Sequence, residues 1–326
     1  MSIDKYLMMG NGFWDSLKRP IMALAPMADV TDAAFRRVIA KYGKPDLMYT
    51  EFVAIDGLLS DGYDKLSKDL IYTDIERPIV AQIFGTKPEN FEKVARMVAD
   101  MGFDGVDINM GCPHHALVKS GTCGGLIGDI PHAKEIVEAT KQGAQSGPNK
   151  IPVSLKTRIG RNKIITEEWI GGLLEAHPAA IAIHGRTVKE MSKVPAHWDE
   201  IAKAAKLCRD AGVVSLGNGD IKDLRDAREK VSESGTDGAM LGRAIFGNPW
   251  LFSEYIPTLQ ERLSVMLLHA QIYDELFTGI KPFALMRKHF GSYVGGFNGA
   301  KELRTKLMEA ENSKEVEEMI KPYLEN

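Results

Sequence analysis

One stretch of the chain decides how the rest is interpreted: Asp107–Gly128, with the sequence DINMGCPHHALVKSGTCGGLIG. A short apolar segment over residues 105–109 predicts a strand, which ends in the polar amide of Asn109. Cys112 follows three residues later and directly precedes Pro113. Proline fixes its own φ angle and has no N–H group, so this turn is stiff and holds the thiol at a set position after the strand. On its own, however, a Cys-Pro pair is more often a buried cysteine in a tight turn than a reactive group.

The composition is that of an ordinary globular protein. The chain has 326 residues, of which 44% are hydrophobic and 26% charged, and this length suits one large domain and one small one. Its three cysteines show no C-x-x-C spacing, so neither a disulfide framework nor a zinc site is expected. We therefore expect a protein of the reducing cytoplasm that carries no metal ion.

No targeting or membrane-spanning segment is expected. Residues 1–14 lack a long apolar run after their lysine, which argues against a signal peptide. No stretch approaches the roughly 18 apolar residues that a membrane span needs. The formal net charge of −3 counts mildly against a nucleic-acid partner, because proteins that neutralise many phosphates are often basic, but it does not exclude a local basic face.

The pattern along the chain predicts an α/β protein built as a closed (β/α)8 barrel, the TIM barrel, over residues 1–248. Eight short apolar strands are expected, most of them followed by a segment with helical periodicity; they lie at residues 20–27, 47–52, 78–84, 104–109, 151–156, 179–184, 213–217 and 237–241. An open doubly wound sheet is the alternative, but no G-x-G-x-x-G follows the first strand. After Pro249 the strands stop, and residues 249–326 predict a small all-helical domain.

Polar side chains stand at the carboxyl end of nearly every expected strand, where barrels of this kind carry their chemistry. A buried Gln or His is by itself more often a satisfied core residue, but strand ends need none of these groups for packing. The residues at these ends are Pro26, Met27, Ala28, Gln82, Asn109, Cys112, Lys156, Arg158, His184, Arg186, Asn218, Gly219, Asp220, Gly242 and Arg243.

The last two strand ends predict a phosphate site. Gly217-Asn218-Gly219 and Gly242-Arg243 allow close backbone approach and supply one cation, although two ordinary glycine turns remain the alternative. Lys156 and His184 come from adjacent strands and point to the open end of the barrel at the strand carboxyl ends, which we call the mouth. Gln82 can both donate to and accept from a pyrimidine-like edge. Pro26-Met27 offers an apolar wall. A phosphate beside a heteroaromatic ring describes flavin mononucleotide (FMN) better than a sugar phosphate.

The sequence motifs resemble those of the tRNA-dihydrouridine synthase family over nearly the whole chain. The DINMGCP match is highly specific, whereas GNGD and GRA are shared with other flavin barrels. The other motifs that resemble the family, in order, are LAPMADVTDAAFR, VAQIFG, SLKTRIG, IHGRT, AMLGRA and, in the helical region, MRKHFGSYVGGFNGAKELR. Two loops depart from its pattern: His114-His115 and SGTCGGLIG follow GCP, and KEMSKVPAHW follows HGRT.

The resemblance implies a flavin-binding barrel followed by a tRNA-binding helical domain, and reduction of the uridine C5=C6 bond by FMN that is recharged by NADPH or NADH. It implies that Cys112 protonates C5 while C6 receives a hydride; a cysteine thiol has a reference pKa of about 8.5 and can supply that proton. The FMN ligands would be Pro26, Met27, Ala28, Gln82, Lys156, His184, Asn218, Gly219, Asp220, Gly242 and Arg243.

The resemblance also implies residues that meet the RNA. Asn109 would hold the uracil or flavin edge, and Arg158 and Arg186 would meet the RNA or the target base, which has to leave the RNA stack. A phosphate-facing surface on the helical domain would comprise Arg287, Lys288, Lys301, Arg304 and Lys306. The alternative for that surface is a solvated helix face paired with Glu302 and Glu309.

Two other functions compete with this one: an FMN-dependent reductase of a free pyrimidine or another small enone, and a non-catalytic RNA-binding protein. The first would need no basic helical domain, and the second would need neither Cys112 nor the flavin-binding residues. We expect a monomer that acts on tRNA.

Overall fold

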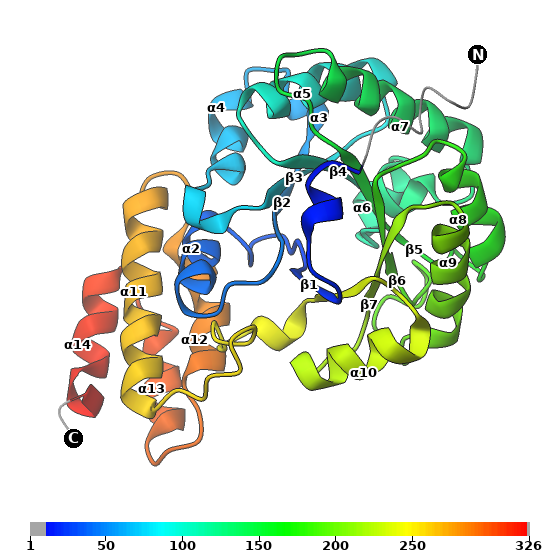
Figure 1. Ribbon diagram of the computed structural model, residues 1–326. Helices are drawn as coiled ribbons and strands as arrows, with labels where there is room; N and C mark the ends of the chain where they lie inside the picture. The colour runs from blue at the N-terminus through cyan, green and yellow to red at the C-terminus, as the bar shows by residue number, and fades with distance from the viewer. Residues whose placement is uncertain (1–10, 325–326) are drawn as a thin grey trace.

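The computed structural model describes residues 11–324. Most of the segment examined for a signal peptide, residues 1–10, lies outside this range, as do residues 325 and 326. Eight parallel strands form the centre of the fold (Figure 1). They are β1 Ile21–Leu24, β2 Met48–Ala54, β3 Ile79–Phe84, β4 Gly105–Met110, β5 Val153–Arg158, β6 Ala180–His184, β7 Val214–Asn218 and β8 Gly238–Leu241.

The strands close into a barrel, which confirms the predicted fold class. Their order is β1-β8-β7-β6-β5-β4-β3-β2, and the two ends of this order meet at one bridge between Ala23 and Leu47. Leu24 N–H donates to the carbonyl of Leu47 at 3.0 Å beside that bridge. Each strand occurs within a few residues of its predicted position, because short apolar runs bounded by turn residues mark buried parallel strands well.

Helices cover the outside of the barrel (Figure 1). Their ends follow local signals: Asp32 and Asp223 cap α2 and α10 through their side chains, and Gly235 ends α10 in the left-handed conformation. The connection after β2 contains short turns instead of one long helix. The barrel helices are α2 Ala33–Tyr42, α3 Ile55–Leu58, α4 Tyr63–Leu66, α5 Pro88–Asp100, α6 His115–Lys119, α7 Ile130–Gln145, α8 Thr166–Leu174, α9 Trp198–Asp210 and α10 Leu224–Ser234, with the 3₁₀ turns η1 Gly12–Ser16, η2 Ser67–Leu70, η3 Asp74–Glu76, η4 Cys123–Leu126 and η5 Arg243–Ile245.

The amino end of the barrel is filled by side chains. Trp14 in η1 is buried and packs in the barrel interior with apolar side chains from the strands, and η1 lies in front of the barrel in Figure 1. Phe13 approaches Gly105, where a Cβ atom would lie 3.1 Å from the phenyl ring. With this end filled, the carboxyl ends of the strands form the mouth.

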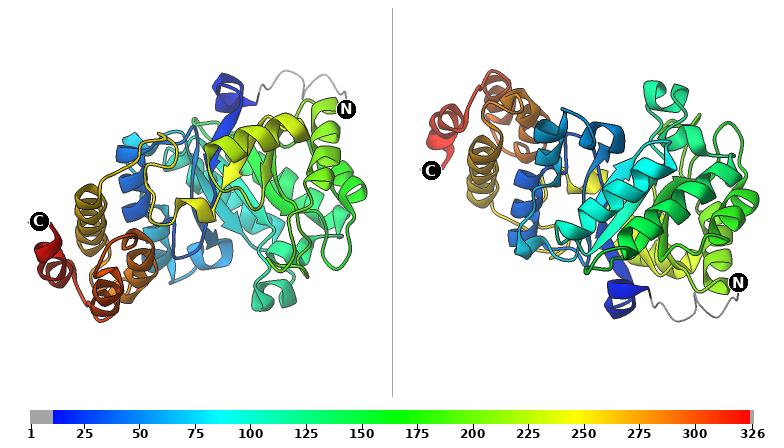
Figure 2. Two further views of the ribbon diagram at one scale, coloured as in Figure 1. Left: turned by 90° about the horizontal axis from the view of Figure 1, so that it is seen from below. Right: turned by 90° about the horizontal axis from the view of Figure 1, so that it is seen from above.

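The residues after β8 form helices only, and we call residues 259–324 the helical region. It comprises α11 Leu259–Phe277, η6 Phe283–Met286, α12 Arg287–Tyr293, α13 Ala300–Leu307 and α14 Ser313–Leu324. Thr258 and Glu261 form a capping box at the start of α11. Two views agree that the region lies beside α2 (Figures 1 and 2). No helix among residues 11–324 is long and apolar enough to cross a membrane.

Buried charges and rings join the helical region to the barrel. Lys281 Nζ lies 3.0 Å from Glu51 Oε2 and 2.6 Å from Asp69 Oδ1. The rings of His269 and His289 both pack against Phe35 of α2, with centroids 4.8 and 4.7 Å away. These contacts hold α11 and α12 against the first barrel helix.

Candidate active site

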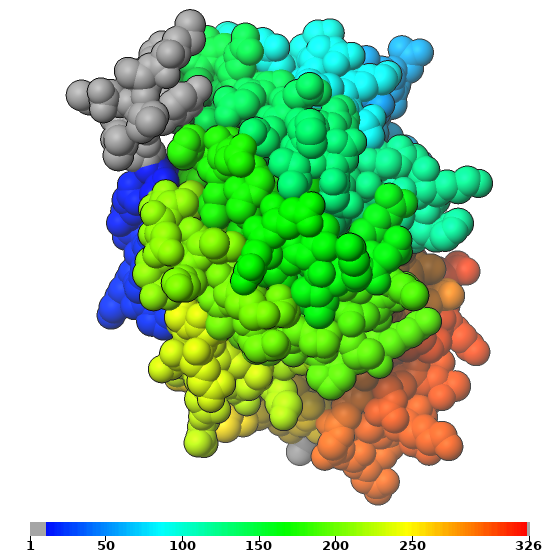
Figure 3. Space-filling view, turned by 90° about the vertical axis from the view of Figure 1, so that its right-hand side faces the viewer, coloured from blue at the N-terminus to red at the C-terminus, as the bar shows by residue number. Residues whose placement is uncertain are grey.

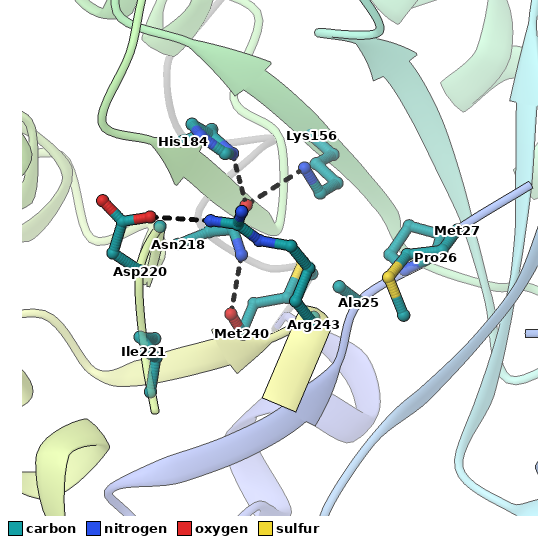
Figure 4. Close-up of a pocket in the computed structure, with 12 residues that line it drawn as sticks. Ala25, Pro26, Met27, Lys156, His184, Asn218, Asp220, Ile221, Met240 and Arg243 are labelled. Carbon is teal, nitrogen blue, oxygen red and sulfur yellow. Dashed lines mark hydrogen bonds and ion pairs between the residues drawn. The ribbon is translucent and has the colours of Figure 1, made fainter. Parts of the chain in front are cut away.

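A cavity of about 200 Å³ opens at the mouth of the barrel (Figure 4). It contains nine of the eleven residues that the sequence predicted for FMN, although they come from five separate strand ends. Ala28 and Gln82 lie elsewhere: Ala28 is exposed, and Gln82 is fully buried. The cavity is lined by Ala25, Pro26, Met27, Lys156, His184, Asn218, Gly219, Asp220, Ile221, Met240, Gly242 and Arg243.

Asn218 organises the polar wall of this cavity. Its Nδ2 donates to the carbonyl of Met240 at 2.7 Å, so its Oδ1 must face the other side. There Oδ1 lies 2.8 Å from Nδ1 of His184 and accepts from Lys156 Nζ at 3.4 Å. The imidazole therefore carries its proton on Nδ1. Burial, together with the nearby Arg158 and Lys156 charges, holds the pKa of His184 well below its usual value, so the ring is neutral.

The turn after β7 holds a second group of charges. Gly219 has a φ angle of 133° and Asp220 one of 51°, and a Cβ atom at position 219 would lie 2.7 Å from Cβ of Ala196. The Asp220 carboxylate binds Arg186 and, at 2.8 Å, Nη2 of Arg243. Its hydrogen bond from Arg186 lowers the pKa of Asp220, which therefore stays ionised. Arg243 is thus held at the cavity rim by a fixed carboxylate.

Lys156 supplies the positive charge inside the cavity. Burial and the neighbouring Arg158 lower its pKa to about 8, so most of the population remains protonated at neutral pH. The surrounding residues fit FMN in chemistry: the half-buried Lys156 cation and a neutral imidazole line one side, and a glycine turn with Arg243 lines the other. These are the groups expected for the ring or ribityl oxygens and for the phosphate, respectively.

Cys112 lies half-buried beyond the end of β4. Its backbone N–H and that of Gly111 both donate to Asn109 Oδ1 at 3.0 Å. Asn109 Nδ2 donates to Gln82 Oε1 at 3.0 Å, and Gln82 Nε2 donates to Asp107 Oδ2 at 2.7 Å. We call Asp107, Gln82 and Asn109 the amide relay. Because a carboxylate only accepts, Asp107 fixes the direction of each bond up to the Cys112 turn.

The relay lies beside the cavity. Asn109 is paired in register with Lys156 of β5, and Lys156 interacts electrostatically with both Asp107 and Cys112. Asp107 also accepts from Ser154 Oγ at 2.6 Å. Burial raises the pKa of Asp107 to about 6, so this carboxyl is mainly ionised at neutral pH. The arrangement fixes the thiol-bearing turn next to the half-buried Lys156 of the cavity.

Arg158 and Arg186 are both buried, with 8% and 2% of their surface exposed. Arg158 Nε donates to the carbonyl of Gly111 at 2.8 Å, and its Nη1 donates to the carbonyls of Thr187 and Met191. Arg186 Nε donates to the carbonyl of Val194 at 2.5 Å. In this structure the two guanidinium groups therefore fix loops around Cys112, and their predicted contact with RNA stays a prediction.

Three of the five residues predicted for the phosphate-facing surface of the helical region differ in position, whereas Lys301 and Lys306 are both exposed. Lys288 is exposed, and its Nζ donates to the carbonyl of Asp29 at 2.8 Å, next to the cavity wall. Arg304 is half-buried and donates to the carbonyl of Val294 at 2.8 Å. Nε of Arg287 is buried and has no hydrogen-bond partner among residues 11–324. Of these residues, Lys288 donates a hydrogen bond to a loop at the mouth, whereas Arg304 bonds within the helical region.

Sequence reasoning missed Asp107, Ser154 and the cluster around Lys281. An aspartate inside the apolar run GVDIN was a usable signal, because a buried carboxylate needs partners. Lys281 and Glu51 are 230 residues apart in the sequence, so no local sequence pattern indicates their contact.

Known proteins resemble this chain over nearly its whole length. The family model described as dihydrouridine synthase (Dus) matches residues 23–326. The chain is 38% identical over 322 residues to the probable tRNA-dihydrouridine synthase 2 of Bacillus subtilis, covering 97% of each chain. It is likewise 38% identical over 323 residues to the probable tRNA-dihydrouridine synthase of Staphylococcus epidermidis, again covering 97% of each.

Among solved structures, a complex of morphinone reductase with tetrahydroNAD matches 72% of this chain and 86% of its own, with a TM-score of 0.49 and 14% identity. The family model spans both the barrel and the helical region, and the two relatives match over nearly their full length. This chain therefore belongs to the dihydrouridine synthase family.

Proposed function

We propose that the protein reduces the C5=C6 bond of uridines in tRNA, with FMN as its cofactor and NADPH, or NADH, as the reductant. One observation carries the proposal: a half-buried thiol, on a turn held by the amide relay, lies beside a cavity that is lined by a lysine and by a glycine-arginine turn. The reaction would take place in the cytoplasm, where tRNA is found, and a monomer contains every residue it needs.

The cavity residues would divide the cofactor between them. Gly219, Gly242 and Arg243 would hold the phosphate, Lys156 and His184 the ribityl chain or ring, and Met27 would provide an apolar wall. The chemistry that FMN supplies when bound is hydride delivery to C6 of the uracil.

The protein's own part in the reaction is to deliver a proton. As C6 gains a hydride, negative charge develops at C5 and O4 of the uracil, and C5 has to be protonated. Cys112 Sγ would donate that proton from the face opposite the flavin. The amide relay holds Gly111 and Cys112 by their N–H groups, and Arg158 holds the Gly111 carbonyl, so the thiol would need no reorganisation at the moment of transfer.

The test uses the purified full-length protein. It should release FMN on denaturation, and incubation with NADPH and tRNA that lacks dihydrouridine should add two mass units at each modified site. Cys112→Ala should keep its flavin and lose turnover by at least about 100-fold. Cys208→Ala is the matched control, because Cys208 is a fully buried thiol of α9.

Two results would contradict the proposal. A colourless protein that takes up no FMN would remove the cofactor assignment. Reduction of free uracil or a small enone, with none on tRNA, would instead select a small-molecule reductase of the same fold.

A further inference from the structure

Three consecutive loops at the mouth are joined into one surface. They are residues 111–128 after β4, residues 159–165 after β5 and residues 187–195 after β6, and we call them together the β4–β6 rim. The amides of Val188 and Lys189 donate to the carbonyls of Gly160 and Arg161 at 2.9 and 3.0 Å. Arg161 Nη1 reaches the carbonyl of Gly125 at 3.5 Å. Arg158, which directly precedes the second loop, binds carbonyls of the other two.

The exposed charges of the β4–β6 rim are all positive. The three loops contain five lysines and arginines and one acid, Glu190. Glu190 is turned inward, where it binds the amide of Thr187 at 2.7 Å and His197 Nε2 at 3.1 Å. All five cations are exposed, and none forms an ion pair with a carboxylate among residues 11–324; they are Lys119, Arg161, Lys163, Lys189 and Lys193.

The loop after β2, on the other side of the mouth, has an excess of acidic residues. Residues 55–78, after β2, contain six acids against three lysines and arginines. Since the whole chain has a net charge of −3, the cations of the rim are concentrated locally and do not reflect a basic protein. A surface of unpaired cations beside an active site attracts anionic ligands to it.

Apolar side chains stand among these cations. Ile164 and Met191 are 41% and 44% exposed, and Met191 has a φ angle of 53°, which is rare for its residue type. Arg158 binds the Met191 carbonyl at 3.1 Å and the Gly111 carbonyl at 2.8 Å, so the backbone that carries this exposed side chain is held relative to the Cys112 turn. Cations that alternate with exposed apolar groups suit a nucleic-acid strand whose bases are partly unstacked.

The rim and the helical region lie on different sides of the mouth. In Figure 2, α6 and the C-terminal helices project toward the same end of the barrel from opposite sides. In Figure 3, the green segments that include α8 and α9 cover the face toward the viewer, and the orange helical region lies below them. A polymer that crosses the mouth would therefore meet both surfaces.

We propose that the β4–β6 rim binds the phosphate backbone of the RNA on the far side of the target uridine from the helical region. This inference rests on the proposed function and adds to it a second RNA-binding surface, built from the loops that surround Cys112. The exposed Met191 and Ile164 would contact the bases next to the extruded uridine.

The test compares two triple variants of the full-length, flavin-loaded protein. The rim variant carries Lys163→Glu, Lys189→Glu and Lys193→Glu. The control variant carries Lys18→Glu, Lys44→Glu and Lys206→Glu, which change the same charge at exposed lysines away from the mouth. Binding of unmodified tRNA is measured between about 50 and 300 mM salt, and dihydrouridine formation and flavin content are measured alongside.

The rim variant should bind tRNA at least about tenfold more weakly than the control variant, and the slope of log Kd against log salt should fall by about one for each phosphate that the altered rim no longer binds. Equal Kd values and equal slopes for the two variants would overturn the inference, even if the parent protein forms dihydrouridine. In another outcome, the parent protein forms no dihydrouridine while its tRNA binding still depends on the rim. That result would contradict the proposed reaction and support the rim as an RNA-binding surface. A rim variant that loses its flavin would also overturn the inference, because the loops would then act through the cofactor site.

Discussion

At the scale of single residues, Asp107 controls the orientation of groups that it does not touch. An amide can be turned by 180° at little cost in shape, so Gln82 and Asn109 each have two possible hydrogen-bonding patterns. The carboxylate of Asp107 accepts only, which selects one pattern for both and directs Asn109 Oδ1 at the N–H groups of the Cys112 turn. Asp107 is therefore a positioning residue.

We expect Asp107→Asn to lower kcat by about 10- to 100-fold with little change in flavin content, because the loss of one charge-assisted hydrogen bond costs about 1.5–3 kcal/mol. The parent kcat should also fall as pH decreases through about 6, where Asp107 gains a proton, and this inflection should be absent from the variant. The measurement is the pH profile of kcat. Ser154→Ala, which removes the other partner of Asp107, is the control, and an unchanged inflection in Asp107→Asn would contradict the assignment.

A second residue-scale prediction concerns Gly219. Its φ angle of 133° and the 2.7 Å approach that a Cβ atom would make to Ala196 leave no room for a side chain. Gly219→Ala should therefore weaken FMN binding by at least about tenfold, measured by flavin fluorescence titration. Gly171→Ala in α8 meets nothing within 4 Å and should leave FMN affinity unchanged.

At the scale of elements, the contact between barrel and helical region depends on Lys281. Burial alone would lower the pKa of this lysine, but Glu51 and Asp69 outweigh it and keep the ammonium charged. Burial in turn raises the pKa of Glu51 to about 7. The same carboxylate accepts from the amide of Asp29 at 2.5 Å, in the loop that follows the cavity wall. The Glu51 side chain of β2 thus connects the segment between α11 and η6 to the loop after β1.

Lys281→Met should lower the free energy of unfolding by about 3 kcal/mol, since it leaves buried carboxylates without their counterion. The loss should be larger at pH 8 than at pH 6, because Glu51 can take up a proton at the lower pH and avoid an unpaired charge. Urea unfolding at both pH values measures this. Lys301→Met, at an exposed lysine of α13, should change stability by less than about 0.5 kcal/mol, and equal losses at the two positions would contradict the role of Lys281.

The elements were more predictable than the contacts between their side chains. Strands such as residues 78–84 are marked by a local run of apolar residues, and the barrel follows from their number. Gln82 shows the limit of this reasoning: the sequence places a polar group at a strand end, but its partner Asp107 is 25 residues away. Whether a strand-end side chain faces the cavity or a neighbouring strand depends on that partner. For the same reason the burial of Arg158 and Arg186 could not be read from the sequence.

At the scale of the whole molecule, acid should weaken the junction between barrel and helical region first. His269 and His289 are buried there, and His269 Nε2 and both ring nitrogens of His289 have no hydrogen-bond partner among residues 11–324. Burial lowers the pKa of His289 to about 3 and that of His269 well below its usual value. The unfolded chain therefore binds protons near pH 6.5 that the folded protein does not bind, and stability is lost as pH falls below that value.

Each histidine should contribute about 1.4 kcal/mol of lost stability per pH unit below about 6.5. Glu51 and Asp107 act in the opposite direction in part of this window, because their raised pKa values let the folded protein bind protons first. A comparison of variants isolates the histidine effect: His289→Leu should reduce the slope of unfolding free energy against pH between 6 and 4.5 by about one proton. An unchanged slope would show that His289 is already charged in the folded protein.

The single bridge between Ala23 and Leu47 has a consequence for any attempt to shorten this protein. Every other pair of neighbouring strands shares three or more registered pairs, so native-state opening should begin between β1 and β2, and deuterium should enter the amides of Leu24 and Asp46 before those of β4. The helix α2 that follows β1 is covered by α11. A fragment ending at Asn248 would lack α11, so α2 and the weak contact between β1 and β2 would lose their cover. We therefore expect that the barrel does not fold stably without the helical region.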